Sequence, residues 1–378
     1  MNSLAASTTP RYTESSRTLR AQLLSHFQKL QNADGGWPFH QAGESRVEPT
    51  CWALRALADS SDFAQSNITR GLDFLKSQQL SDGSWPATHG MESGGWMTSL
   101  VCGVLAQFPS IEEFLHPTAD VGAPGSSLEP GSSLSQSSIE KQIHAGLQWL
   151  CDDFPRDSSR WQKFLSHFQS NKHAEHNDEF RGWGWTPRTA SWVEPTAFAL
   201  MALASVSEVL SSDSSVAPGP HPKSGLRSEL PKSLAHKLEQ RRSLAIGLLY
   251  DRMCAGGGWN CGNPRVYGVD GDSLVLPTCW ALLALRKAPE HPNRGLSLTW
   301  LQKSFATIAS PGSLAIAQIT LETYGIPIPA ASHNLSDCSA ADLAKQGTHI
   351  AAWAALALNP ARAWFAQSQP KAAAGPPQ

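Results

Sequence analysis

Two glutamates lie at equivalent positions of a repeated motif, and both could act as acids. Glu48 and Glu194 each precede Pro-Thr and a stretch that is rich in alanine and leucine. A carboxyl group buried beside apolar side chains keeps its proton to higher pH and can then protonate a substrate. The alternative role is structural, because a carboxylate near a helix N-terminus offsets the helix dipole and accepts capping hydrogen bonds. Both residues are therefore candidates for either role.

Two further repeats place Leu276 and His349 at the same position. In all four repeats a large aromatic residue follows four positions later: Trp52, Phe198, Trp280 and Trp353. We expect Glu48, Glu194 and His349 to converge on one opening, with the four aromatic rings lining an apolar cavity behind it. The faces of such rings can stabilise a carbocation.

Three arginines lie in the polar loops that precede the apolar stretches: Arg46, Arg188 and Arg265. Guanidinium groups bind a diphosphate bidentately, and the N-termini of parallel helices would add positive potential at the same end. The alternative is that each arginine pairs with a nearby carboxylate, such as Arg46 with Glu48 or Arg265 with Asp270. If the arginines bind a diphosphate, we expect them to surround the opening.

Metal binding has limited support in the sequence. Asp270 and Asp272 could hold Mg²⁺ together with a diphosphate substrate, or they could form a solvated acidic turn. We expect no tightly bound zinc, because the seven cysteines show no CxxC spacing and Leu276 cannot ligate the metal. Apart from Mg²⁺ with a diphosphate, no cofactor is expected.

Four Gly-Trp turns organise the chain, and a threonine follows each of them. Trp37 to Thr50 is a step of thirteen residues, which recurs from Trp85 and from Trp183, whereas the step from Trp259 to Thr278 is longer. Such a period indicates supersecondary units that cannot bury their apolar faces alone. Glycine allows the backbone turn, and we expect each tryptophan to fill the space between neighbouring units and to donate its N–H to a helix end.

Apolar periodicity and helix breakers predict six helical hairpins. Their expected ranges are 19–31 with 49–58, 68–79 with 97–107, 139–151 with 195–206, 234–254 with 277–286, 296–308 with 313–324, and 341–345 with 349–358. The second helix of each pair is apolar nearly all round, which is typical of a buried helix. The sequence thus predicts an all-α fold, a single α/α toroid with inner and outer helix rings. An open solenoid is the alternative.

We expect the toroid to span residues 17–360 as one domain. Ser- and Pro-rich insertions interrupt it at about 117–138 and 211–233. Residues 1–16 and the end of the 361–378 tail, after about 369, have the composition of disordered segments.

Composition excludes several classes of function. The net charge is −2 and no run of Lys or Arg is present, so nucleic-acid binding is not expected. An odd number of cysteines without paired spacing favours reduced thiols and a cytoplasmic location. No apolar run approaches the ~20 residues of a membrane span, so at most we expect contact with a membrane surface.

Residues 31–37 and 78–85 follow the pattern Gln, a few residues, then Gly-x-Trp. This pattern resembles the repeat of squalene-hopene and oxidosqualene cyclases and of protein prenyltransferase β-subunits, and the likeness extends over about residues 19–358. The resemblance implies an α/α toroid that handles isoprenoids, and His349 lies where a prenyltransferase has its zinc-binding histidine. The Asp-x-Asp-Asp acid of hopene cyclases is absent, and Asp272 replaces the cysteine of the prenyltransferase zinc segment.

The resulting expectation is a toroid that binds a hydrophobic isoprenoid ligand. Whether it also cyclises or transfers the prenyl chain is left open by the incomplete signatures, as is any protein partner. The alternative is a catalytically silent toroid that serves as a lipid-binding or protein-interaction module.

Overall fold

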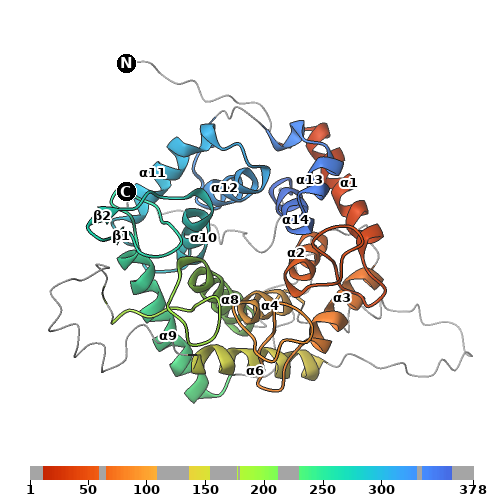
Figure 1. Cartoon of the computed structure of the whole chain (residues 1–378), viewed down its shortest axis with the longest axis horizontal. Coiled ribbons are helices and arrows are strands. Elements are labelled where there is room, and N and C mark those ends of the chain that lie inside the picture. The colour runs from red at the N-terminus through yellow and green to blue at the C-terminus, as the bar shows by residue number, and fades with distance from the viewer. Residues whose placement is uncertain are drawn as a thin grey trace, which may run out of the picture.

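The computed structural model describes residues 12–58, 65–108, 136–153, 177, 179–211, 230–329 and 334–359. In this part of the chain the helices form two concentric rings (Figure 1). The inner ring consists of α2 (Val47–Ala58), α4 (Met97–Leu105), α8 (Val193–Ser211), α10 (Val275–Leu285), α12 (Pro311–Thr323) and α14 (Thr348–Ala357). The outer ring consists of α1 (Glu14–Leu30), α3 (Gln65–Ser77), α6 (Gln136–Asp152), α9 (Lys232–Asp251), α11 (Arg294–Ser304) and α13 (Ala340–Lys345).

The ring of inner helices is closed. This confirms the predicted toroid, and the alternative prediction of an open solenoid is wrong. Each inner helix packs against the next one along the chain, and α14 packs against α2. Hydrogen bonds seal the junction, since Thr348 donates its backbone N–H to Phe39 O at 2.8 Å and its hydroxyl to Pro38 O at 2.6 Å. The last inner helix is thereby tied to the loop of the first repeat.

The four turn tryptophans have the predicted role. Their rings are buried, and each indole N–H donates to a carbonyl near the end of the outer helix of its own hairpin. The acceptors are Phe27 O at 2.8 Å, Leu75 O at 2.7 Å, Leu150 O at 3.0 Å and Leu249 O. Each tryptophan also donates its backbone N–H to the threonine of its repeat, at 2.8–3.0 Å: Thr50, Thr98, Thr196 and Thr278. The turn therefore joins the end of the outer helix to the start of the inner helix.

The glycines of the turns allow one hairpin to dock on the next. Gly35 has a φ of +90°, and a Cβ at this position would lie 2.3 Å from Arg70 O of α3. Gly83 has a φ of +89° and approaches Ala145 O of α6 in the same way. The motif glutamine reinforces this contact, since Gln31 Nε2 donates to Gly35 O and to Asn67 O, both at 2.8 Å. Neighbouring hairpins are thus joined through backbone groups.

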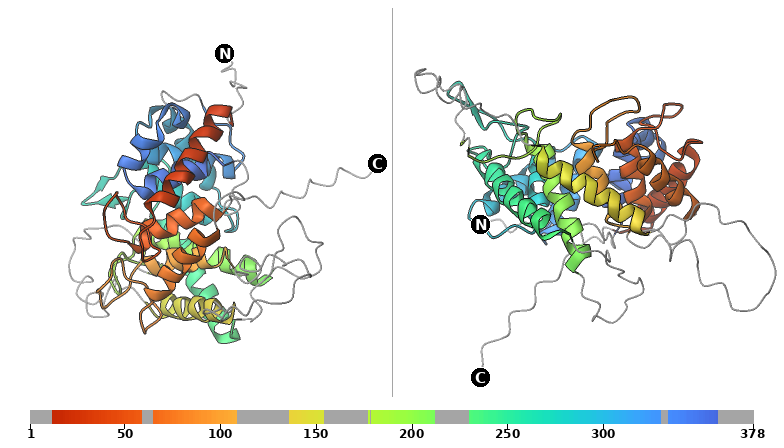
Figure 2. Two further views of the ribbon diagram at one scale, coloured as in Figure 1. Left: turned by 90° about the vertical axis from the view of Figure 1, so that its right-hand side faces the viewer. Right: turned by 90° about the horizontal axis from the view of Figure 1, so that it is seen from below.

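The loops between outer and inner helices lie on one side of the ring (Figure 2). We call this side the mouth face; it is formed by residues 31–46, 86–96, 182–192 and 252–274. The last of these loops contains a small hairpin, β1 (Arg265–Val266) and β2 (Val269–Asp270), which accounts for the longer step from Trp259 to Thr278. Short 3₁₀ turns, Phe305–Thr307 and Leu335–Asp337, complete the described elements.

Several helix boundaries differ from expectation. Helix α1 begins at Glu14, inside the segment expected to be disordered, because Thr13 Oγ1 caps it by accepting from Ser16 N at 3.2 Å. Helices α6 and α9 begin at Gln136 and Lys232, slightly before the expected ends of the two insertions. The rest of both insertions and the 361–378 tail lie outside the described residues. Within the described residues, no helix is long and apolar enough to cross a bilayer.

We predict that the turn tryptophans dominate stability. Replacing Trp37 or Trp259 with alanine removes a fully buried ring and its hydrogen bond, which should cost about 3–5 kcal/mol in free energy of unfolding. Urea denaturation followed by circular dichroism measures this cost. The control is Trp192→Ala, because Trp192 is 38% exposed and should change stability by much less. Equal stabilities of all four proteins would contradict the prediction.

We also predict that Thr348→Val weakens the ring closure. The substitution keeps the side-chain volume but leaves Pro38 O without the hydroxyl donor at the buried junction, which should cost about 1–3 kcal/mol. Thr299→Val is the matched control, because the Thr299 hydroxyl donates to Gly295 O on the exposed side of α11. The two variants should therefore differ in urea midpoint, and equal midpoints would refute the role of Thr348.

Candidate functional site

Four aromatic side chains meet at the axis of the toroid. The Trp52 ring lies 5.6 Å from that of Trp280 and 5.5 Å from that of Trp353, and Phe198 lies 5.1 Å from Trp280, between ring centroids. Helices α2 and α10 lie on opposite sides of the inner ring (Figure 1), so a contact between Trp52 and Trp280 spans the axis. The sequence led us to expect an apolar cavity lined by these rings, whereas the structure has them in mutual contact.

The aromatic cluster continues towards the mouth face through two residues that the sequence analysis did not select. Trp96 stacks on Phe198 with 5.1 Å between centroids and contacts Trp185 edge-on at 5.3 Å. Trp96 precedes the repeat threonine Thr98 by two positions, which is the spacing of Glu48 from Thr50. That spacing was the signal that could have identified it. A row of rings thus runs from the loops to the axis.

Glu48 lies at the edge of this cluster, in the first turn of α2. Its side chain is partly buried, and this burial raises the pKa of the carboxyl group from 4.5 to about 7, while a hydrogen bond from the Trp52 side chain offsets only part of the effect. Arg55, two turns beyond Glu48 on the same helix, lies 5.5 Å from the Trp52 ring centroid. Glu48 is therefore an acid that exchanges its proton near neutral pH beside an aromatic surface.

Glu194 occupies the equivalent position on α8 and has a different neighbour. Burial raises the pKa of its carboxyl group, and the thiol of Cys261 donates a hydrogen bond that partly opposes this. Cys261 comes from the next motif-bearing loop, where its carbonyl accepts from Val193 N at 3.0 Å. The sequence contained no signal for this pairing, because the two residues belong to different repeats.

His349 opens α14 and also lies in the cluster. Its ring contacts Trp353 at 5.3 Å and Phe39 at 5.4 Å, between centroids. Burial and then the neighbouring His40 lower the pKa of His349 to about 4, so the imidazole is neutral at pH 7. Its Nδ1 and the Nε1 of Trp353 are buried and have no hydrogen-bond partner among the described residues.

Two of the three arginines form ion pairs within their own loops. Arg46 pairs with Glu44 at 3.1 Å rather than with Glu48, and Arg265 pairs with Asp270 across the hairpin at 3.5 Å, as the alternative for that residue predicted. Arg188 is exposed, and its backbone N–H donates to Asp153 Oδ1 at 2.9 Å. The ion pairs reduce the positive charge that Arg46 and Arg265 could offer to a diphosphate.

The acidic pair Asp270 and Asp272 is not part of a larger set of ligands. Asp270 ends β2 and Asp272 follows it, and both are exposed. Across the residues that the structure describes, no group of three or more His, Cys, Asp or Glu side chains could hold a metal ion. The geometry thus adds nothing in favour of Mg²⁺ at this position.

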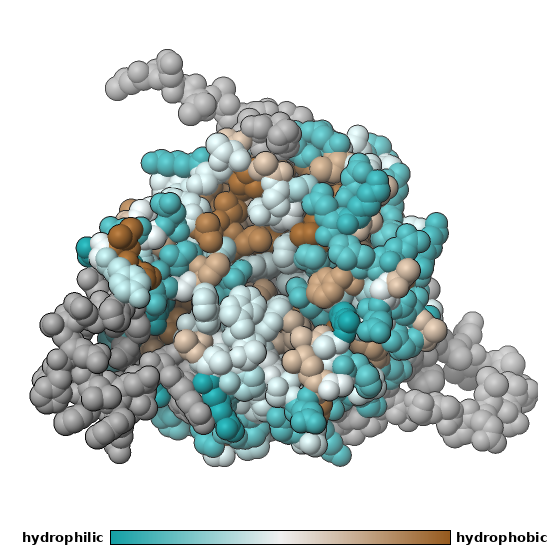
Figure 3. All heavy atoms as spheres, in the orientation of Figure 1, coloured by the Kyte–Doolittle hydropathy of each residue, from teal (hydrophilic) through white to brown (hydrophobic). Residues whose placement is uncertain are grey.

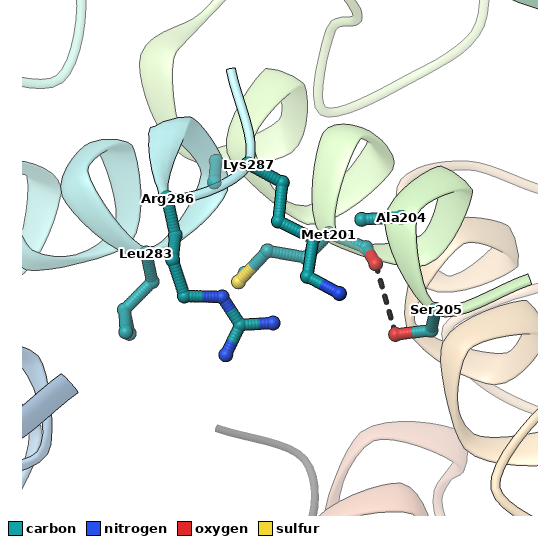
Figure 4. A pocket seen from close by; sticks show the side chains of 7 residues that line it. Met201, Ala204, Ser205, Leu283, Arg286 and Lys287 are labelled. Carbon is teal, nitrogen blue, oxygen red and sulfur yellow. Dashed lines mark hydrogen bonds between the residues drawn. The ribbon is translucent and has the colours of Figure 1, made fainter. Parts of the chain in front are cut away.

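A small hollow lies between the middle of α8 and the C-terminal end of α10 (Figure 4). Its lining includes Met201, Ser205, Leu283 and Arg286, and its volume of about 10 Å³ has room for one water molecule. Burial lowers the pKa of the Arg286 guanidinium group. The hollow is too small for a prenyl chain, so the mouth face remains the candidate site.

Comparisons with known proteins concern the fold. No family model matches the chain, and no curated protein matches its sequence. Among solved structures, the type II terpene cyclase MstE from Scytonema is 13% identical with a TM-score of 0.46, over 82% of this chain and 74% of that one. An α-amylase from Clostridium perfringens is 10% identical with a TM-score of 0.49, over 90% of this chain and 96% of that one.

A family 8 glycosyl hydrolase from Klebsiella pneumoniae, an endoglucanase, is 11% identical with a TM-score of 0.48, over 89% of this chain and 98% of that one. These proteins catalyse different reactions, and all three TM-scores are below 0.5. At such low identity, the likeness assigns neither a substrate nor a reaction to this chain.

We predict that Glu48 makes stability depend on pH. The pKa of its carboxyl group is about 7 in the folded protein and 4.5 ordinarily. The stabilising contribution of Glu48 to the free energy of unfolding is therefore fully present below pH 4.5 and is lost as the pH rises through about 7. Relative to Glu48→Gln, the wild type should lose up to about 3 kcal/mol over this range. Urea denaturation at both ends of the range tests this, with the exposed Glu92→Gln as the control. A constant difference between wild type and Glu48→Gln would contradict it.

Proposed function

We propose that the protein binds an uncharged apolar ligand of the isoprenoid class at the mouth face, and that Glu48 can protonate this ligand. The observation that carries the proposal is the position of the Glu48 carboxyl group, partly buried and in contact with Trp52 at the edge of the aromatic cluster. An acid in this position has both a proton to give at neutral pH and rings to receive the charge that results.

The proposed step is proton transfer to a carbon–carbon double bond. The Glu48 carboxyl group gives its proton to one alkene carbon, the π electrons form the new C–H bond, and the other carbon becomes a cation. Trp52 and its ring neighbours Trp280 and Trp353 would stabilise the cation through their faces. Loss of a proton from an adjacent carbon, with Glu48 or Glu194 as the base, would complete the reaction without a change in oxidation state.

The charge distribution favours an uncharged ligand over a diphosphate. Arg46 and Arg265 are engaged with Glu44 and Asp270, and His349 is neutral at pH 7. The described part of the chain also lacks a cluster of metal ligands that could accompany a diphosphate. Because the rings contact one another, the ligand must lie over their mouth-side edge or move them apart.

The second candidate is the catalytically silent module that binds lipids or proteins. The specific observation in its favour is the filled axis. The contacting rings of Trp52, Phe198, Trp280 and Trp353 have centroids 5.1–6.3 Å apart, so they occupy the volume that a prenyl chain would need. In this interpretation the buried carboxyl groups are features of helix starts only.

We expect wild-type protein to retain uncharged isoprenoids and to convert one of them. The experiment is incubation with squalene, geranylgeraniol, and farnesyl and geranylgeranyl diphosphates, followed by mass spectrometry of products and of ligand that co-purifies with the protein. Glu48→Gln should still retain ligand but form no product, because glutamine matches the shape of the acid and has no acidic proton. Glu239→Gln, on the exposed side of α9, is the control and should behave as wild type.

The other outcomes are informative. Retention without product in any of the three proteins would favour a silent lipid-binding module, and neither retention nor product would favour a protein-interaction module. Conversion of a diphosphate that requires Mg²⁺ would contradict the proposal of an uncharged ligand.

A further inference from the structure

The hairpin on the mouth face presents an apolar tip to solvent. Strands β1 and β2 are joined by Tyr267 and Gly268, whose φ angles of +53° and +76° are those of a type I′ turn. Tyr267 is 74% exposed and Val269 is 70% exposed, with Val266 beside them. Tyr267 and Val269 thus present most of their surface to solvent.

The neighbouring loops add further exposed apolar side chains. Trp192 lies beside the hairpin loop, with its ring 3.4 Å from the position that a Cβ on Gly262 would occupy. The loop before α4 touches the next loop, since a Cβ on Gly95 would lie 2.9 Å from Trp185 O. Together these loops carry six of the exposed large apolar residues in the described part of the chain: Met91, Trp192, Val266, Tyr267, Val269 and Leu274.

We propose that these six residues, the apolar arc, bind the surface of an electrically neutral lipid bilayer. The arc follows contiguous loops on one side of the ring, and Figure 3 shows its hairpin at the rim, separate from the apolar side chains near the axis. A planar partner can contact loops that are spread along a rim, whereas a protein groove needs one compact patch. Tyrosine and tryptophan are also the side chains that favour the interface between a bilayer and water.

Charge indicates which kind of bilayer is bound. Arg265 and Asp270 form an ion pair on the hairpin at 3.5 Å, and Asp272 leaves the loop without an excess of positive charge. Attraction to anionic lipids needs clustered Lys or Arg side chains, which this loop does not have. Insertion of apolar side chains is therefore the driving force, and zwitterionic phosphatidylcholine is the matching lipid. The inference holds whether or not the protein handles isoprenoids.

The test is co-sedimentation of the full chain with phosphatidylcholine vesicles. The variant is Tyr267→Asn with Val269→Thr, in which Asn-Gly is the preferred type I′ sequence and threonine keeps β-branching, so the hairpin fold is preserved. We expect this variant to lower the vesicle partition coefficient about tenfold, because most of the apolar area of the tip is removed. Circular dichroism should show an unchanged thermal midpoint.

The control is Leu296→Gln, because Leu296 is 57% exposed but lies on α11, outside the arc. It should bind vesicles as wild type does. Absence of wild-type binding, or equal loss in the control, would overturn the proposal. Vesicle binding that requires anionic lipid and is abolished by added salt would also overturn the proposal. Self-association of wild type without vesicles that the double variant abolishes would make the arc an interface between copies of this chain.

Discussion

A buried indole N–H must find an acceptor, and the way this chain satisfies that requirement determines its architecture. Each turn tryptophan donates its ring N–H to the end of an outer helix and its backbone N–H to the threonine of the following inner helix. Two hydrogen bonds from one residue thus fix the start of the inner helix relative to the end of the outer one. Because the connection is repeated, inner helices begin at matching heights, and residues two positions before each threonine share a level: Glu48, Trp96, Glu194 and Leu276.

The architecture could be predicted because its determinants are local. The Trp-to-Thr spacing reflects one hydrogen bond, which survives even in the fourth motif, where Trp259 N reaches Thr278 Oγ1 at 2.8 Å despite the inserted hairpin. The apolar character of the inner helices follows from their burial on all sides. The start of α1 was misjudged because a single capping residue, Thr13, outweighs the polar composition that surrounds it.

The details of the site could not be predicted because they depend on distances across the ring. Whether Trp52 and Trp280 enclose a cavity or touch depends on the width of the inner ring, which follows from the packing of all its helices. The partner of Glu194 is a cysteine from a different repeat, and Arg46 pairs with Glu44 rather than with Glu48. These pairings depend on the three-dimensional positions of the residues, and the spacing of residues in the sequence does not indicate them.

Closure of the ring by Thr348 has a consequence for how the chain acquires its structure. The hydrogen bond from Thr348 to Pro38 O joins residues 310 positions apart, and the side of α2 that packs on α14 stays uncovered until α14 is available. During synthesis an open arc of hairpins would therefore present unpaired apolar helices at both ends. Long-range closure of this kind slows folding and exposes aggregation-prone surface, so the nascent toroid is a natural client for chaperones.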